Sequence, residues 1–91
     1  MPSDVFKALA DPTRREIISM LRVGPLTSGQ IAECFPSAWA TISRHLGVLR
    51  EADVIQATRE GANIVYELNT TVLQELVTQI FDWTNKENGD A

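Results

Sequence analysis

The chain has a single cysteine, Cys34, and therefore cannot form an internal disulfide. No run of apolar residues approaches the roughly 18 that a membrane-spanning helix requires. The start of the chain, Met1 to Lys7, lacks both the charged segment and the long apolar segment of a secretion signal. These absences predict a reduced, cytoplasmic setting with no membrane partner.

Residue types that carry chemistry are also scarce, and His45 is the only histidine. The sequence contains no glycine-rich phosphate loop, no nucleophile paired with a base, and no acidic pair at a useful spacing. No cluster of side chains approaches the four ligands of a zinc site. We therefore expect no catalytic residue, no metal site and no cofactor.

What the chain does have is enough apolar residues for one small core. Its 91 residues, 44% of them hydrophobic, predict a single domain over 1–91. Because a domain of this size is only marginally stable, we expect it to gain stability from a partner subunit.

The formal net charge of −4 argues at first against a nucleic-acid partner, but the charges are unevenly distributed. Residues 12–61 carry six arginines against five acidic residues, a net charge of +1. Residues 62–91 carry one lysine against five acidic residues. The acidic excess lies mainly in this C-terminal third, so the arginine-bearing middle is compatible with a polyanionic partner.

Two helices are predicted at the start of the chain, the first over about 3–10. Asp11 and Pro12 signal the start of the second, because Asp11 can accept hydrogen bonds from the first amides and Pro12 needs no amide donor there. The apolar stripe of this second helix is expected to reach Val23.

A third, short helix is predicted to open at Thr27 and Gln30, which are spaced as a capping box. Ser37 is expected to cap a fourth helix over 38–51. Its inward positions follow a helical rhythm and are Ala38, Ile42, Leu46 and Leu49.

Residues 54–58 and 64–68 are rich in β-branched side chains and predict two strands. Gly61 and Asn63 lie between them as turn formers, which indicates a β-hairpin.

A last helix is predicted over about 70–84, with Thr71 and Gln74 spaced as another capping box. Its apolar face is unusually broad and consists of Val72, Leu73, Leu76, Val77, Ile80, Phe81 and Trp83. The predicted fold class is therefore mainly α with a small β-hairpin (α+β). The element order α-α-α-α-β-β-α is that of a winged helix-turn-helix.

Three segments in this order and spacing resemble the ArsR/SmtB family of bacterial winged-helix repressors: Phe6–Arg15, Ser43–Ala52, and Arg59–Gly61 leading into Tyr66–Asn69. The resemblance covers nearly the whole chain. Residues 68–74 further resemble the SdpR-type branch of that family, whose members are autorepressors without a metal site.

The resemblance implies a homodimer, joined through the first and last helices, that represses transcription from an imperfect palindrome in double-stranded promoter DNA. The surplus apolar surface of the last helix agrees with such a contact. The candidate interface residues are Val5, Phe6, Leu9, Leu73, Leu76, Val77, Ile80 and Trp83. The alternative is that they all face the core of their own subunit.

The resemblance also places the fourth helix in the major groove and the wing, residues 58–63, near the minor groove. Among the outward residues of the fourth helix, Arg44 is the one able to make a bidentate contact with guanine. The candidate DNA-binding residues are Ser37, Ala40, Thr41, Ser43, Arg44, His45, Gly47, Arg59 and Asn63. His45 is expected to be packed or to touch a phosphate. Trp39 is expected to cover the junction with the third helix.

The chain departs from the family pattern after the fourth helix, where Asp53 stands in place of the usual glycine. An aspartate can adopt the left-handed conformation of that position, but at some strain. The chain also departs from the pattern in the wing, where Thr58 and Ala62 replace basic residues found in many relatives. The low positive charge of the wing and of residues 12–61 leaves a second hypothesis open, a protein-interaction module without DNA affinity. A third is a redox-responsive or metal-responsive repressor that uses Cys34, although buried filler is the favoured role of that residue. Release from DNA has three candidate routes: an effector molecule, a sequestering protein or dilution.

Overall fold

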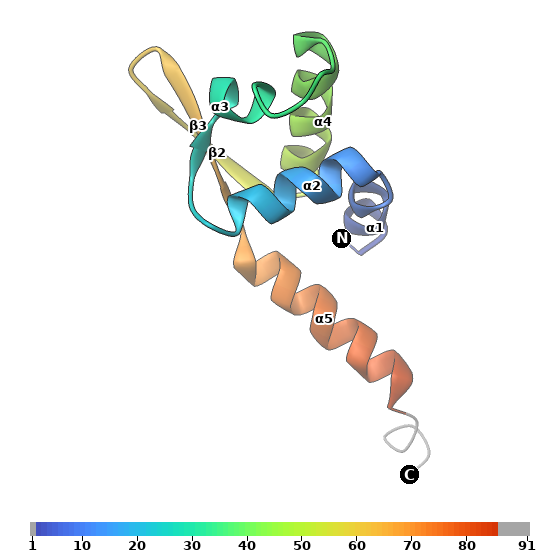
Figure 1. Ribbon diagram of the computed structural model, residues 1–91. Coiled ribbons are helices and arrows are strands. Elements are labelled where there is room, and N and C mark those ends of the chain that lie inside the picture. Colours follow the sequence, from blue (N-terminus) through green and yellow to red (C-terminus); the bar gives the residue numbers. More distant parts are fainter. Residues whose placement is uncertain (1, 86–91) are drawn as a thin grey trace.

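The computed structural model describes residues 2–85, so Lys86, Glu87 and Asp90 of the acidic C-terminal third lie outside the described residues. Four helices pack on one another and on a small sheet, and a fifth helix leaves this body (Figure 1). The elements are α1 (Pro2–Leu9), α2 (Pro12–Leu21), β1 (Leu26–Thr27), α3 (Ser28–Ala32), α4 (Trp39–Glu51), β2 (Ile55–Glu60), β3 (Asn63–Leu68) and α5 (Thr70–Thr84).

Two of the predicted helix starts are confirmed. The Asp11 carboxylate accepts hydrogen bonds from the amides of Thr13 and Arg14, at 2.8 and 3.2 Å. At α3 the capping box is complete, since the Gln30 amide donates to Thr27 Oγ1 and the Thr27 amide donates to Gln30 Oε1. Both motifs satisfy amides that the helix itself leaves without a partner.

Two other predicted caps are wrong. The residue that caps α4 is Ala38 instead of Ser37, and it has no side-chain oxygen to offer. Ala38 is also exposed and does not point inward as its spacing predicts. Helix α5 begins after Asn69 and makes no side-chain cap, so the Thr71 box does not form. Helix α2 ends at Leu21, which leaves Val23 beyond it and 88% exposed.

The predicted hairpin is confirmed and is longer than expected, with Asn63 already inside β3 and paired with Glu60. Gly61 occupies the turn at a φ of 64°, a left-handed conformation that glycine adopts without strain. The short strand β1 adds to the other edge of β3, giving the antiparallel order β1-β3-β2. Sequence periodicity missed β1 because two residues are too few to show alternation.

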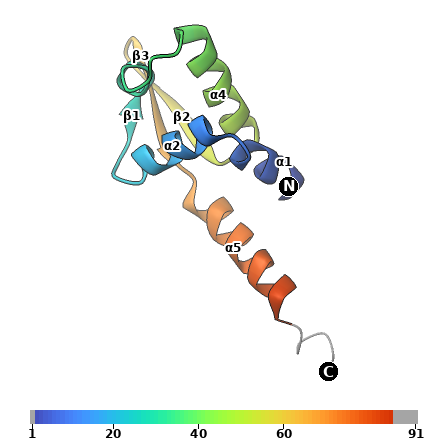
Figure 2. The same cartoon turned by 45° about the vertical axis from the view of Figure 1, so that its right-hand side comes forward.

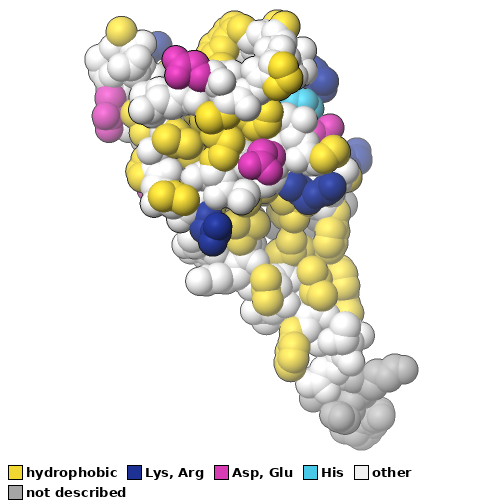
Figure 3. Space-filling model, in the orientation of Figure 1, with side chains coloured by type: hydrophobic (Ala, Val, Ile, Leu, Met, Phe, Trp, Pro, Cys, Tyr) yellow, Lys and Arg dark blue, Asp and Glu magenta, His cyan; other side chains and the backbone are white. Residues whose placement is uncertain are grey.

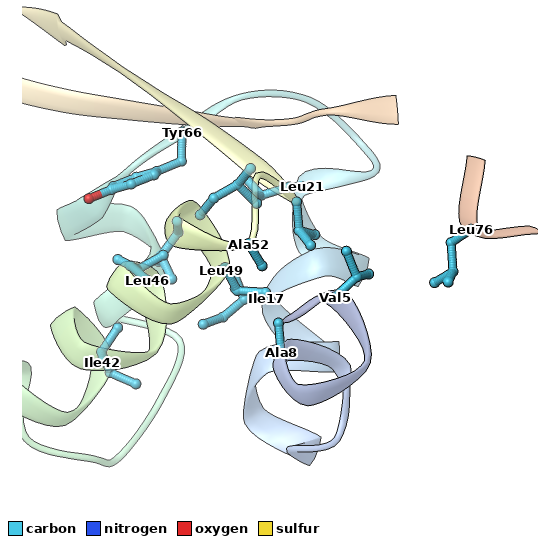
Figure 4. Packing of buried hydrophobic residues seen from close by; sticks show 13 residues of the cluster. Val5, Ala8, Ile17, Leu21, Ile42, Leu46, Leu49, Ala52, Tyr66 and Leu76 are labelled. Atoms are coloured by element: carbon cyan, nitrogen blue, oxygen red, sulfur yellow. The ribbon is translucent and has the colours of Figure 1, made fainter. Parts of the chain in front are cut away.

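The core lies between α2, α4 and the sheet (Figure 4). Ile42, Leu46 and Leu49 point from α4 toward Ile17 of α2, and all four side chains are buried. Tyr66 covers this cluster from β3. Three of the four predicted inward positions of α4 are therefore confirmed, and their burial fixes which side of α4 faces solvent.

Helix α5 contributes little to that core, because Leu76 is its only buried residue. Both ribbon views show α5 running away from α4 and the sheet (Figures 1 and 2). The radius of gyration is 15.1 Å, whereas a compact domain of this length has about 12 Å. The protruding helix accounts for the excess.

The Asp11 cap predicts how stability depends on pH. Burial opposes ionisation of this carboxyl, but the amides of Arg14 and Thr13, together with the field of the Arg14 guanidinium, outweigh it and lower the pKa of Asp11 below its ordinary value of 3.8. The folded state therefore holds the proton less tightly than the unfolded chain. The stability that the ionised cap contributes is present at neutral pH. It is lost as the pH falls from the ordinary pKa of an aspartate through the lowered pKa of Asp11.

We expect Asp11→Ala to lower the melting temperature at neutral pH, because Ala cannot cap. Asp11→Asn still caps but does not titrate, so below about pH 4 its melting temperature should fall less than that of the wild type. Thermal unfolding followed by circular dichroism from about pH 3 to pH 7 measures both effects. Parallel acid profiles of the wild type and Asp11→Asn would contradict this assignment.

Candidate DNA-binding interface

The outward side of α4 brings four of the predicted DNA-binding residues together. Ala40, Ser43, Arg44 and Gly47 are all exposed, on the side opposite the buried row of this helix. Thr41 is half-buried at the edge of this face. In Figure 1, α4 and the tip of the β2–β3 hairpin lie at the end of the molecule from which α5 points away.

Arg44 is the only large charged side chain among these residues, and its neighbours are small. A Cβ atom added at Gly47 would meet nothing within 4 Å, so the surface beside Arg44 is open. A flat, open face of this kind lets a helix approach base edges closely while a guanidinium reaches further.

The N-terminal end of α4 carries amide groups that no side chain caps. Its first intrahelical bonds are from the amides of Thr41 and Ile42 to the Ala38 carbonyl, at 3.0 and 3.2 Å. The amides before them have no intrahelical acceptor, and with the helix dipole they favour an anion such as a phosphate. Ser37 lies exposed just before this end of the helix.

His45 differs from the other predicted contact residues because its side chain is only 6% exposed. Its Nδ1 lies 3.1 Å from Nη1 of Arg14. Since a guanidinium has only donors, Nδ1 accepts this hydrogen bond and the ring proton of neutral His45 lies on Nε2. This burial agrees with the first of the two roles predicted for His45, a packed side chain. It leaves little of the ring available to a phosphate.

The pair Arg14 and Arg15 is a structural feature that the sequence analysis missed. Arg14 donates from Nε to the Ala8 carbonyl at 2.8 Å and from Nη2 to the Lys7 carbonyl at 3.1 Å. Arg15 donates from Nη1 to the Leu9 carbonyl at 2.9 Å. The two arginines donate to carbonyls at the end of α1, and the Lys7 carbonyl also accepts from the Ala10 amide. Basic side chains near the end of a helix commonly bind its last carbonyls in this way. Arg14 thereby links α1 to α4 through His45.

The wing places Arg59 and Asn63 on exposed positions of β2 and β3. Glu60 is paired with Asn63 across the hairpin and sets a negative charge beside Arg59. Thr58 is exposed and uncharged. The positive charge of the wing is thus limited to one arginine.

Asp53 has a φ of 62° directly after α4, which confirms the left-handed conformation predicted for it. An aspartate tolerates this region better than most residues, but at a cost that glycine does not bear. The turn places Val54 back in the core, where it is fully buried.

The predicted interface residues of α1 and α5 fall into two groups. Val5 and Leu76 are buried within the subunit and leave little surface for an intersubunit contact, and Leu9 and Leu73 are half-buried against the same core. The exposed group consists of Phe6, Val77, Ile80 and Trp83. Phe81 is also exposed, although it is not among the predicted interface residues, and together these five residues are here called the α5 face.

The rings of Phe6 and Trp83 stack at a centroid distance of 5.8 Å, which joins α1 to the C-terminal half of α5. Figure 3 shows apolar side chains along the projecting helix, below the basic side chains of the body.

Cys34 is exposed, so its predicted role as buried filler is wrong. Its thiol lies 3.5 Å from the Gln30 carbonyl. Within residues 2–85, no group of three or more His, Cys, Asp and Glu side chains is placed to hold a metal ion. In the same part of the chain, no helix is both long enough and apolar enough to cross a membrane.

Helix α3, the turn after it, the exposed face of α4 and the β2–β3 hairpin define a winged helix-turn-helix protein. A family model described as a helix-turn-helix domain matches residues 9–56. The transcriptional repressor SdpR of Bacillus subtilis (strain 168) is 46% identical over 88 residues, which cover 97% of this chain and 98% of SdpR.

A second relative, the transcriptional regulator Rv2034 of Mycobacterium tuberculosis (strain H37Rv), is 37% identical over 99% of this chain and 85% of its own. Among solved structures, a possible transcriptional regulator for arsenical resistance superposes with a TM-score of 0.78 at 31% identity, covering 89% of this chain and 84% of that one. The chain belongs to the ArsR/SmtB family of winged helix-turn-helix transcriptional repressors.

Proposed function

We propose that this repressor acts as a homodimer on an imperfect palindrome in promoter DNA. Helix α4 of each subunit enters the major groove, and the wing lies near the minor groove. The observation that carries the proposal is the exposed face of α4, on which small residues surround Arg44. Occupation of the promoter blocks transcription.

Affinity and specificity arise from different groups in this proposal. The uncapped amides of α4, Ser37 and Arg59 contact phosphates, while Arg44 reads a guanine. Because each chain carries a net charge of −4, approach to DNA of arbitrary sequence is electrostatically opposed. Non-specific binding is therefore weak, and specific binding falls steeply with added salt.

The α5 face supports the dimer. Val77 is 65% exposed, and the neighbouring large apolar side chains of this face are also in contact with solvent. A monomeric protein rarely leaves so many large apolar side chains of one helix uncovered. A two-fold contact between the α5 faces of two subunits would bury it and would hold the two copies of α4 at a fixed separation.

We assign Arg14 and His45 a positioning role between the dimer contact and the DNA contact. Arg14 binds the end of α1, which carries Phe6 of the α5 face, and His45 belongs to α4. The pair therefore fixes the orientation of α4 relative to the helices that join the subunits.

Substitution of Arg44 tests the base-reading role. We expect Arg44→Ala to weaken binding to a duplex that this protein selects from a random pool by about fivefold or more, because a bidentate guanine contact contributes roughly 1–3 kcal/mol. Binding to a scrambled duplex should change far less. Fluorescence anisotropy at fixed salt measures both affinities.

Arg44→Lys is the matched control, since it keeps the charge but loses the fork geometry. It should bind the scrambled duplex like the wild type and discriminate poorly between the two duplexes. Equal losses on both duplexes would refute base reading by Arg44. A protein-interaction module would form no site-specific complex at all.

A charge placed on the α5 face tests the dimer. We expect Val77→Asp to raise the dimer dissociation constant by at least about tenfold, because desolvating a carboxylate in an apolar contact is costly. Sedimentation velocity over a range of protein concentrations gives this constant. Val23→Asp is the matched control, since Val23 is equally apolar and still more exposed but lies outside the α5 face. A wild-type chain that stays monomeric, or equal effects of both variants, would contradict the proposed interface.

A further inference from the structure

Trp39 stands out among the residues around the exposed face of α4. It is the first residue of that helix, and 53% of its side chain is exposed. The prediction that it covers the junction with α3 stays a prediction, and the exposed half of the residue is available to a partner. An indole left largely in water gives up much of the free energy that burial of so large an apolar group provides.

The position of Trp39 relates it to the proposed DNA-binding face. Trp39 and Ser43 are one helical turn apart, so they lie on the same side of α4. Its other neighbours on the surface, Ala38 and Ala40, are small and exposed. In helix-turn-helix proteins the N-terminal residues of the recognition helix contact the base edges. The indole thus lies at the end of α4 that enters the groove.

The chemistry of the indole restricts what it can recognise there. It has a single donor, Nε1–H, and is otherwise an apolar surface. The base edges of the major groove present one apolar group, the 5-methyl of thymine. Cytosine lacks this methyl and carries an amino group in place of the O4 acceptor of thymine. An indole placed in the groove therefore favours thymine over cytosine.

We propose that Trp39 is a specificity-determining residue that contacts a thymine 5-methyl group in each half-site. The proposal rests on the proposed DNA-binding function and adds a second reader to the face of α4. Arg44 selects a guanine through hydrogen bonds. Trp39 selects a thymine because the contact buries the thymine methyl group and the indole against each other, away from water. Each half-site then contains a guanine and a thymine read from the same helix.

The test is a double-mutant cycle that combines removal of the methyl group from the DNA with removal of the indole from the protein. The probe is a duplex that the wild-type protein selects from a random pool, remade with deoxyuridine at one thymine at a time. At one thymine per half-site, the exchange should weaken wild-type binding by about fourfold, the equivalent of one buried methyl group. The same exchange should leave the affinity of Trp39→Ala unchanged.

Trp39→Phe keeps an apolar ring and should retain part of the sensitivity to the methyl group. Because the sequence has two tryptophans, the emission of Trp39 is obtained as the difference between the spectra of the wild type and of Trp39→Phe. This emission should shift to the blue on the selected duplex, and less so on the deoxyuridine duplex. Circular dichroism of Trp39→Ala should match the wild type, since the side chain supports little of the core.

Two results would overturn the assignment. If no thymine exchange affects the wild type, or if the effective exchange weakens Trp39→Ala to the same degree, Trp39 does not read thymine although the protein reads DNA. If the wild type selects no sequence from the pool, the proposed function and this inference both fail. The two failures are therefore distinguishable.

Discussion

The packing of one side of α4 against α2 is the contact on which the rest of the structure depends. Ile42, Leu46 and Leu49 are buried on α4 and hold the helix in one rotation about its axis. Because that rotation is fixed, the opposite side exposes small residues around Arg44. A rotation of one residue, about 100°, would expose core side chains and bury the surface that can approach DNA. The same hydrophobic contact thus stabilises the domain and orients its binding face.

A polar connection extends this arrangement to the end of the molecule that carries α5. The guanidinium of Arg14 holds two carbonyls at the end of α1 and the imidazole of His45 on α4. The ring contact between Phe6 and Trp83 continues from α1 to α5. Buried apolar contacts, one shared arginine and one aromatic pair therefore form an unbroken path from the proposed DNA contact to the proposed subunit contact.

The sequence predicted those features that depend on local periodicity and on short-range caps. Asp11 and the buried row of α4 follow such rules, and both are confirmed. Ser37 has the right chemistry for a cap, but the chain enters α4 one residue later, and a shift of one residue is enough to remove the cap. The bond between Arg14 and His45 spans 31 residues, so no local pattern reveals it. The exposure of Trp39 depends on which distant segments of the chain reach it, which is a tertiary property.

Protection of DNA by the bound protein tests the central claim most directly. Hydroxyl-radical footprinting on the selected duplex, combined with the stoichiometry from sedimentation, should show two chains per duplex. It should also show two protected segments whose centres are about 10 base pairs apart, since the two copies of α4 occupy successive major grooves. A single protected segment with one chain bound, or no protection at low salt, would contradict the account.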